Sequence, residues 1–416
     1  MATPNELTPR QQQVADDIQV LKGLDHVRFR PGMYIGSRPD AIDNMLYAVL
    51  DNSINEAMVR LCDKIELVIH ADGSITISDN GSGIPVAIYP REGISQLEVE
   101  LTIIFAGGRI RNPLYCVWGG MHGIGLNAVN ALSESLIAEV RRDGYLWRQS
   151  YARGVRTSDL EQIRPMNEGE STGTSITFYP DAEIFLELLK VHDFNFNTLA
   201  NRCRELAYIL PGLTIHLVDQ RETGLPRETT FYFEGGLTSF VKYLNRSRNP
   251  LHTVISGTKT VYVDKDTNRE KIIEIDFAFQ YTDDLRTTEL TFVNTVQTPD
   301  GGTHWTGFRT ALTRTINKWA HKTGFFKDNE ANFIGQNTLE GLTAVVSIKH
   351  PYPQFKSQTN VVFVNPEVKG IVASVVSEFF TQHLESNPDE AQRILDRCRR
   401  ARAEAEAWRN KLTPPL

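Results

Sequence analysis

Three short segments in the first third of the chain combine polar residues and glycines at a spacing that can support chemistry. They are DNSINEA at 51–57, DNGSGI at 79–84 and GGMHGIG at 119–125. An amide side chain, a carboxylate at a strand end and a glycine-rich loop can together hold a metal ion, a base and a run of phosphates. In this order they predict a nucleotide pocket that has no lysine-bearing phosphate loop.

The first two segments supply the side chains. Asn52 is predicted to contact Mg²⁺ and phosphates, because an amide oxygen on a buried helix face can complete an octahedral shell begun by phosphate oxygens. Asp79 ends a predicted strand, and the turn through Gly83 must bring backbone close to a ligand. Its carboxylate can accept the exocyclic amine of adenine, and Ile84 can line an apolar slot beside it. The alternatives are a helix-surface asparagine and a plain Asx-turn.

The third segment supplies backbone. It leads into a helix predicted from about 124 to 133, so its N–H groups can bind phosphates at the entry to that helix. One glycine-rich turn alone would be weak evidence, but six glycines lie between 107 and 125, directly after the other two motifs. The residues assigned to this part of the site are Gly107, Gly108, Gly119, Gly120, His122, Gly123, Ile124 and Gly125.

The elements that must position these residues form a mixed α/β arrangement, with helices on one face of a sheet. Residues 17–36 predict a short helix broken by a Pro-Gly pair and followed by a turn into a strand. Residues 40–61 have apolar residues at helical spacing, and 64–79 alternate around an Asp-Gly turn as a hairpin does. The predicted organisation is an arm at 1–15, domains at 16–230 and 231–400, and a charged helix or tail at 401–416.

Composition bounds the class of protein. Hydrophobic residues make up 41% of the 416 residues and charged residues 23%, which is typical of globular domains. The four scattered cysteines suggest neither a disulfide framework nor a zinc site. A net charge of -7 argues against DNA binding over the whole surface but leaves room for a local basic groove. No apolar run reaches membrane-spanning length, so a cytoplasmic protein without membrane association is predicted.

Together the motifs resemble the ATP-binding half of the B subunit of the type II DNA topoisomerases, gyrase and topoisomerase IV, within the GHKL class of ATPases. The resemblance implies a Bergerat-type sandwich of helices on a mixed sheet, followed by an α/β transducer domain of ribosomal-protein-like fold. It implies ATP and Mg²⁺ as cofactors, ATP-dependent change of DNA topology as the family activity, and a mobile lid that includes Gly107 and Gly108. The partners it implies are DNA, a topoisomerase A subunit or full-length B subunit, and a second copy in a weak or ATP-dependent homodimer.

Further residues are assigned through this resemblance alone. Thr174 matches the threonine beside the adenine-binding aspartate, and Arg148 matches an arginine at the pocket mouth; packing or surface roles are the alternatives for both. Gln358 matches the glutamine of a transducer loop whose lysine touches the γ-phosphate. At that lysine position this chain has Asn360, and Ser82 stands where an arginine is common.

Several other positions depart from the family pattern. Ala48 replaces the glutamate that acts as general base, and Asn44 replaces the histidine that supports it. Cys116 takes the place of a lysine in the family's lid, and Arg109 takes the place of another cation near the phosphates. Gln13 lies roughly where the family has an arm tyrosine that reaches across the dimer. No catalytic base is therefore assigned, and nucleotide binding is expected to survive better than hydrolysis.

Two functions fit this sequence. The first is the ATP-operated clamp region of a type II topoisomerase B subunit. The second is a hydrolysis-defective paralogue that acts as a nucleotide- or partner-binding module. The Glu-Gly-Asp-Ser segment of the DNA-cleavage domain, which accompanies an acidic Asp-x-Asp cluster there, does not occur in these 416 residues. Either a fragment of a B subunit or a short paralogue agrees with that pattern.

Overall fold

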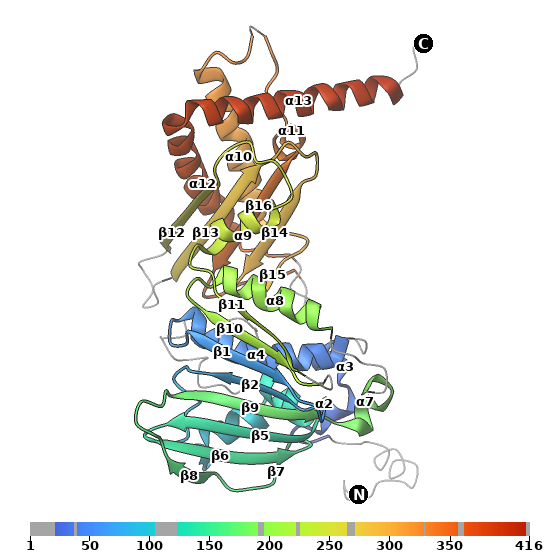
Figure 1. Ribbon diagram of the computed structural model, residues 1–416, viewed down its shortest axis with the longest axis vertical. Coiled ribbons are helices and arrows are strands. Elements are labelled where there is room, and N and C mark those ends of the chain that lie inside the picture. The colour runs from blue at the N-terminus through green and yellow to red at the C-terminus, as the bar shows by residue number, and fades with distance from the viewer. Residues whose placement is uncertain are drawn as a thin grey trace, which may run out of the picture.

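The computed structural model describes residues 21–36, 40–104, 123–189, 195–221, 225–263, 271–327, 329–356 and 362–412. These residues form an elongated molecule with a large sheet at one end and a smaller sheet with long helices at the other (Figure 1). Within the described ranges the sheets have nine, five and two strands. The expected mixed α/β architecture is confirmed.

The nine-stranded sheet belongs to the first domain. Its order is β11-β10-β1-β2-β9-β5-β6-β7, with β8 paired to β6. The strands are β1 (Lys64–Ile69), β2 (Ile75–Asp79), β5 (Ser133–Arg142), β6 (Tyr145–Ala152), β7 (Val155–Arg156), β8 (Glu161–Pro165), β9 (Gly173–Pro180), β10 (Thr214–Asp219) and β11 (Arg227–Phe231). The β1–β2 hairpin is antiparallel as predicted, and β1 pairs in parallel with β10.

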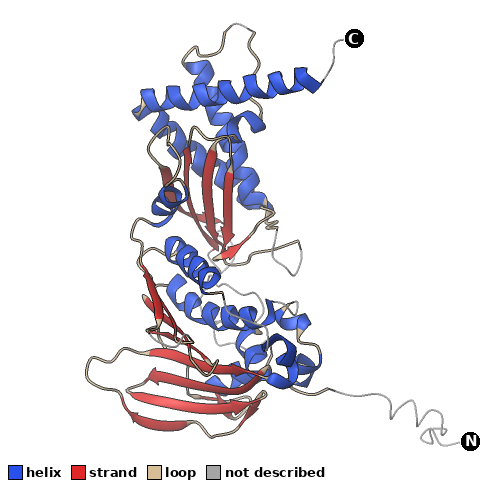
Figure 2. Cartoon of the chain, turned by 45° about the vertical axis from the view of Figure 1, so that its right-hand side comes forward, coloured by secondary structure: helices blue, strands red, loops and turns tan. Residues whose placement is uncertain are grey.

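Helices cover one face of this sheet (Figure 2). They are α2 (Asp25–Phe29), α3 (Gly32–Ile35), α4 (Ala41–Met58), α5 (Gln96–Thr102), α6 (Gly125–Ala131), α7 (Ala182–Leu189) and α8 (Phe196–Ile209), and the hairpin of β3 (Ile88–Tyr89) and β4 (Ile94–Ser95) lies before α5. The apolar stripe predicted on α4 is buried, including Met45, Val49 and Ile54. Burial of this stripe against the sheet fixes which face of α4 is left for polar residues.

The prediction of a strand after Pro31 is wrong, because that segment forms helix α3 instead. Pro31 has φ −58° and ψ −35° at the N-cap position. A proline fixes φ near the helical value and lacks only an N–H that the first helical turn does not use, so it can begin a helix as well as break one.

The second domain packs helices on a five-stranded sheet of order β12-β13-β16-β14-β15. Its elements are α9 (Gly236–Leu244), β12 (Ile255–Val263), β13 (Lys271–Tyr281), β14 (Thr288–Val293), β15 (Val296–Gln297), α10 (Thr303–Lys322), α11 (Gly335–Leu339), β16 (Leu342–Lys349), α12 (Pro366–Ser386) and α13 (Pro388–Leu412). Helices α10 and α12 pack closely together. Helix α13 is continuous through residue 400, where the sequence suggested a boundary, and its end projects from the body (Figure 1).

The two domains meet at α8 and α9. Tyr208 of α8 stacks on Phe233 and Phe240, with ring centroids 3.7 and 4.7 Å apart. The hydrophobic core of the first domain also continues into Phe292 and Val345 of the second sheet. This shared packing places the end of the second sheet near the helix layer of the first domain.

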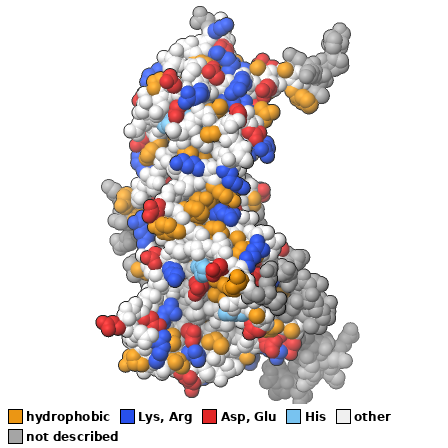
Figure 3. Space-filling model, viewed as in Figure 1, with side chains coloured by type: hydrophobic (Ala, Val, Ile, Leu, Met, Phe, Trp, Pro, Cys, Tyr) orange, Lys and Arg blue, Asp and Glu red, His pale blue; other side chains and the backbone are white. Residues whose placement is uncertain are grey.

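Charged side chains of both signs lie on the face of the molecule shown in Figure 3. They are interspersed over that face. In the part of the chain that the structure describes, no helix combines the length and the apolar character needed to cross a membrane.

Candidate nucleotide-binding site

Asp79 is the centre of the polar network at the end of β2. Its side chain is 3% exposed. One carboxylate oxygen accepts a hydrogen bond from Ser53 Oγ at 2.7 Å, and the other accepts from the N–H groups of Gly81 at 2.9 Å and Thr174 at 3.1 Å. Burial raises the pKa of Asp79, and these hydrogen bonds oppose the increase. The Gly81 contact forms the Asx-turn that the sequence offered as the alternative, so the turn and a fixed acceptor occur together.

Thr174 joins this network to the loop that follows Asp79. It lies on β9, the strand next to β2, and its hydroxyl accepts a hydrogen bond from Ile84 N at 3.1 Å. Because its own N–H donates to Asp79, Thr174 fixes both the carboxylate and the loop. The structure therefore brings together Asp79, Thr174 and Ile84 from segments about 90 residues apart.

Gly83 allows the loop to lie against the neighbouring strands. Its φ is +75°, and an added Cβ would lie 3.1 Å from both Val140 Cγ1 and the carbonyl oxygen of Arg141. Left-handed backbone costs other residues about 1–2 kcal/mol. A glycine is required here for conformation and for space.

Helix α4 presents one polar face toward the same loop. Asn52 is 7% exposed on this helix. One turn later, a carboxylate oxygen of Glu56 accepts hydrogen bonds from Ser82 N at 3.1 Å and Ser82 Oγ at 2.8 Å. One turn earlier, Ala48 faces the start of α6, since a Cβ added at Gly125 would lie 3.4 Å from Ala48 Cβ. The positions of Ala48, Asn52 and Glu56 thus follow one helix face between the glycine segment and the loop after Asp79.

Comparisons with known proteins address this arrangement. A model of the histidine kinase-, DNA gyrase B- and HSP90-like ATPases matches residues 37–184, and a DNA gyrase B model matches residues 236–412. The crystallised 43K ATPase domain of Thermus thermophilus gyrase B, solved with an aminocoumarin, is 34% identical with a TM-score of 0.76, covering 94% of this chain and 99% of that chain. The chain belongs to the DNA gyrase B family.

Sequence comparison with curated relatives supports the same family assignment. The gyrase B protein of Haloferax volcanii is 43% identical over 401 residues, which cover 94% of this chain and 60% of the relative. The gyrase B protein of Clostridium acetobutylicum is 41% identical over 399 residues, which cover 96% of this chain and 59% of the relative. The chain therefore spans about 60% of the length of these gyrase B relatives. The similarity confirms the expected ATPase and transducer region of a type II topoisomerase B subunit, and with it the use of a nucleotide.

At position 48, where the resemblance implies a general base, this chain has only a methyl group. Ala48 is half-buried and contributes no proton acceptor. Asn44 has a structural contact instead of supporting a base, since its Nδ2 donates to Ile35 O at 2.8 Å and ties α4 to α3. This contact gives Asn44 a structural role between the two helices.

Arg148, assigned to the pocket mouth, contacts an acidic residue of the neighbouring strand. Arg148 donates to Glu139 Oε1 from Nε at 2.9 Å and Nη2 at 2.6 Å. In the strand register Thr174 lies opposite Val140, and Arg148 lies opposite Glu139. Because successive side chains point to opposite faces, Arg148 lies on the sheet face away from Thr174. Its described contacts are with Glu139, and its place at the pocket mouth stays a prediction.

Two other arginines contact the site, and sequence reasoning missed both. Arg142 Nη1 donates to Gly83 O at 2.6 Å and Ser82 O at 3.3 Å, and Arg141 Nη2 donates to Asp79 O at 2.8 Å. Both end β5, just before an Asp-Gly turn. That hairpin signal was present in the sequence, but the proximity of β5 to Asp79 depends on strand order.

Several residues assigned from the sequence lie outside the described residues. They are Gly107, Gly108, Gly119, Gly120, His122 and Gln358 from the predicted site, and Gln13, Arg109, Cys116 and Asn360 from the departures. Gly123, Ile124 and Gly125 are described, and Gly123 has φ +58°. The geometry of the site therefore comes from α4, the ends of β2, β5 and β9, and residues 123–125.

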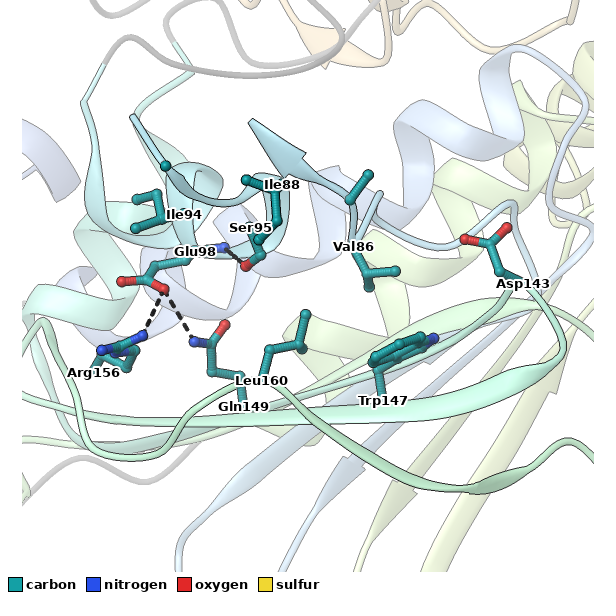
Figure 4. A pocket seen from close by; sticks show the side chains of 12 residues that line it. Val86, Ile88, Ile94, Ser95, Glu98, Asp143, Trp147, Gln149, Arg156 and Leu160 are labelled. Atoms are coloured by element: carbon teal, nitrogen blue, oxygen red, sulfur yellow. Dashed lines mark hydrogen bonds and ion pairs between the residues drawn. The ribbon is translucent and has the colours of Figure 1, made fainter. Parts of the chain in front are cut away.

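A cavity of about 570 Å³ lies beside this candidate site (Figure 4). Val86, Ile94, Trp147 and Leu160 are among its apolar lining residues. At one end a carboxylate oxygen of Glu98 accepts from Gln149 Nε2 at 3.2 Å and also contacts Arg156. The cavity is next to the predicted pocket but does not contain Asn52, Asp79 or Thr174.

Proposed function

We propose that this chain is the ATP-binding clamp region of a type II topoisomerase B subunit, with ATP bound at Asp79. The observation that carries the proposal is the buried Asp79 carboxylate, held by Ser53, Gly81 and Thr174 at the end of β2. A carboxylate fixed in this way can accept the amine of adenine with little further ordering. Arg142, through its contacts with Gly83 and Ser82, supports the loop at the pocket mouth in place of Arg148.

Mg²⁺ is the second proposed cofactor. The donor chemistry fits, because the Asn52 side-chain oxygen lies on the α4 face that runs between the glycine segment and Asp79. Asn52 would hold the ion together with phosphate oxygens, and residues 119–125 would supply backbone N–H groups. When bound, the ion neutralises phosphate charge. Asn52 itself orients that end of the nucleotide.

Isothermal titration calorimetry with a non-hydrolysable ATP analogue, with and without Mg²⁺, tests the binding site. Wild type should give heat, and Asp79→Ala should give none within the same concentration range. Asn52→Ala should retain binding without Mg²⁺ and lose most of the Mg²⁺-dependent gain. Equal binding by wild type and Asp79→Ala would remove the assignment.

Hydrolysis is proposed to be at or near background. Ala48 supplies no general base, and loss of such a base costs about 10²- to 10⁴-fold. A phosphate-release assay should show a low rate that Ala48→Glu combined with Asn360→Lys increases, and Asn44→His should orient the new carboxylate. A wild-type rate that these substitutions do not increase would contradict this part of the proposal.

The proposed partners are a second copy, DNA, and a topoisomerase A subunit or full-length B subunit, in the cytoplasm. The homodimer should be weak and only slightly tightened by nucleotide, which sedimentation velocity measures directly. A tight dimer that appears only with the analogue would show a working clamp. The second candidate, a hydrolysis-defective binding module, is favoured by Ala48. It predicts that the chain binds a full-length B subunit and lowers the ATPase rate of that partner.

A further inference from the structure

Two histidines and a glutamate meet in the second domain, where helices α12 and α13 pack beside the loop that follows α9. They are His252 of that loop, His383 of α12 and Glu390 of α13. Each offers a ring nitrogen or a carboxylate oxygen, and these three atoms all lie within 4.8 Å of one another. Among the residues that the structure describes, this is the one group of three such side chains close enough to share a metal ion.

Glu390 is held in place by the residues around it. Its Oε1 accepts from Thr253 N at 3.1 Å, and its Oε2 accepts from Thr253 Oγ1 at 3.0 Å. The same Oε2 lies 2.9 Å from His383 Nε2. The side chains of His383 and Glu390 are each 15% exposed, so both are largely shielded from water. An oriented carboxylate against an imidazole nitrogen is the arrangement from which metal sites in proteins are built.

His252 is fixed more firmly than the other two residues. It is 5% exposed, and burial lowers its pKa to about 4, so its ring is neutral near pH 7. Its Nδ1 donates to Thr253 O at 2.5 Å, and its Nε2 accepts from Tyr281 N at 2.8 Å. Coordination through either nitrogen exchanges at least one of these hydrogen bonds for a bond to the metal. A zinc–imidazole bond is the stronger of the two, so the exchange is favourable.

A cavity of about 720 Å³ gives an ion access to this cluster. His252, Thr253 and Glu390 are among its lining residues. Arg393 also lines it, and the Nη2 of that arginine lies 4.0 Å from Glu390 Oε1. An ion can therefore enter from the cavity, and a water molecule on that side can complete its coordination.

We propose that His252, His383 and Glu390 form a binding site for a transition-metal ion of the Zn²⁺ class. Imidazole nitrogens favour Zn²⁺ and similar metals, whereas Mg²⁺ prefers oxygen ligands. Two imidazoles and one carboxylate, with a fourth position left to water, are a donor set that zinc proteins use.

The ion takes Nε2 of His383 when the proton of that neutral ring lies on Nδ1. It joins α12, α13 and the loop after α9 at one point. The site is separate from the proposed ATP site at Asp79, and it does not depend on nucleotide.

Calorimetric titration of the tag-free, chelator-treated chain with ZnCl₂, in excess Mg²⁺ and without nucleotide, tests the site. Wild type should bind one Zn²⁺. His383→Gln and Glu390→Gln should each weaken binding by about 100-fold or more, and Thr253→Val, which removes a hydroxyl that orients Glu390, by about tenfold. His216→Gln is the matched control and should bind as wild type. His216 lies 3.7 Å from Glu228, but no third described ligand completes that pair.

Urea unfolding of wild type provides a second measurement that needs no variant. Zn²⁺ at about 100 times its Kd should raise the ratio of folded to unfolded protein by about 100-fold, because the site exists only in the folded chain. His252→Gln tests the third ligand, since its amide oxygen can still accept from Tyr281 N, and it should weaken binding by about tenfold or more.

Three outcomes would each overturn the proposal. The first is that wild type neither binds Zn²⁺ nor is stabilised by it. The second is that His383→Gln and Glu390→Gln bind as wild type does, which would place the ion elsewhere. The third is that His252→Gln keeps the wild-type Kd, which would leave only two ligands.

Discussion

Replacing Asp79 by asparagine should separate the folding role of this residue from its recognition of a base. The substitution keeps the side-chain volume. The oxygen of an asparagine can still accept the N–H groups of Gly81 and Thr174, which lie 2.9 and 3.1 Å away. The new amide nitrogen would face Ser53 Oγ, which can turn from donor to acceptor. All three structural hydrogen bonds thus have replacements.

The expected magnitudes follow from these contacts. Stability should change by about 1 kcal/mol or less, because the weaker neutral hydrogen bonds are offset by relief of the carboxylate burial that raises the pKa of Asp79. Nucleotide binding should suffer more. A hydrogen bond to a charged group contributes about 1.5–3 kcal/mol, and an amide nitrogen would oppose the adenine amine with a second donor. The Kd should rise by about 10- to 100-fold.

Calorimetry with a non-hydrolysable ATP analogue, together with urea unfolding, measures both quantities. Asp219→Asn is the matched control. Asp219 also ends a strand of the same sheet, is 5% exposed and accepts hydrogen bonds, in its case from Arg221. The control should keep the wild-type Kd. An unchanged Kd for Asp79→Asn, or an equal loss in both variants, would refute the reasoning.

Three further predictions each compare a variant with a matched variant or compare two pH values. Arg142→Ala should weaken analogue binding severalfold, because it removes the donor to Gly83 O. Arg148→Ala, on the opposite sheet face, should leave binding unchanged in the same calorimetric measurement. The reverse pattern would place Arg148, and not Arg142, at the nucleotide pocket. Gly173→Ala should lower the free energy of unfolding in urea by about 3 kcal/mol or more, because the new Cβ would clash with Asp79 O. Gly169→Ala, which lies in open space at φ +76°, should lower it by about 1 kcal/mol. Equal losses in the two variants would contradict the clash. Burial raises the pKa of Asp51 to about 6, so its charged form destabilises the fold above that pH, and this penalty disappears below the unfolded pKa near 4. Asp51→Asn should therefore be more stable than wild type at pH 8, by about 1–3 kcal/mol more than at pH 4. A difference between variant and wild type that does not depend on pH would contradict the raised pKa.

The sequence by itself determined the local features. The spacing of apolar residues defined helix α4 and left Asn52 on a different face from its core stripe. Alternation around an Asp-Gly turn defined the hairpin that ends at Asp79. Gly83 was expected at a tight turn, and its φ of +75° agrees. These features follow from helix and strand periodicity and from backbone sterics, which act over a few residues.

Only the tertiary structure decided which distant residues meet. The order β2-β9-β5 placed Arg141 and Arg142 at Asp79 and Gly83, and the same register turned Arg148 away. The packing of α8 under the second sheet joined Arg202 to Thr295. Strand alternation says that neighbouring side chains point to opposite faces, but not which strand lies beside which. That choice depends on burial of the whole core, a cooperative property that no short segment contains.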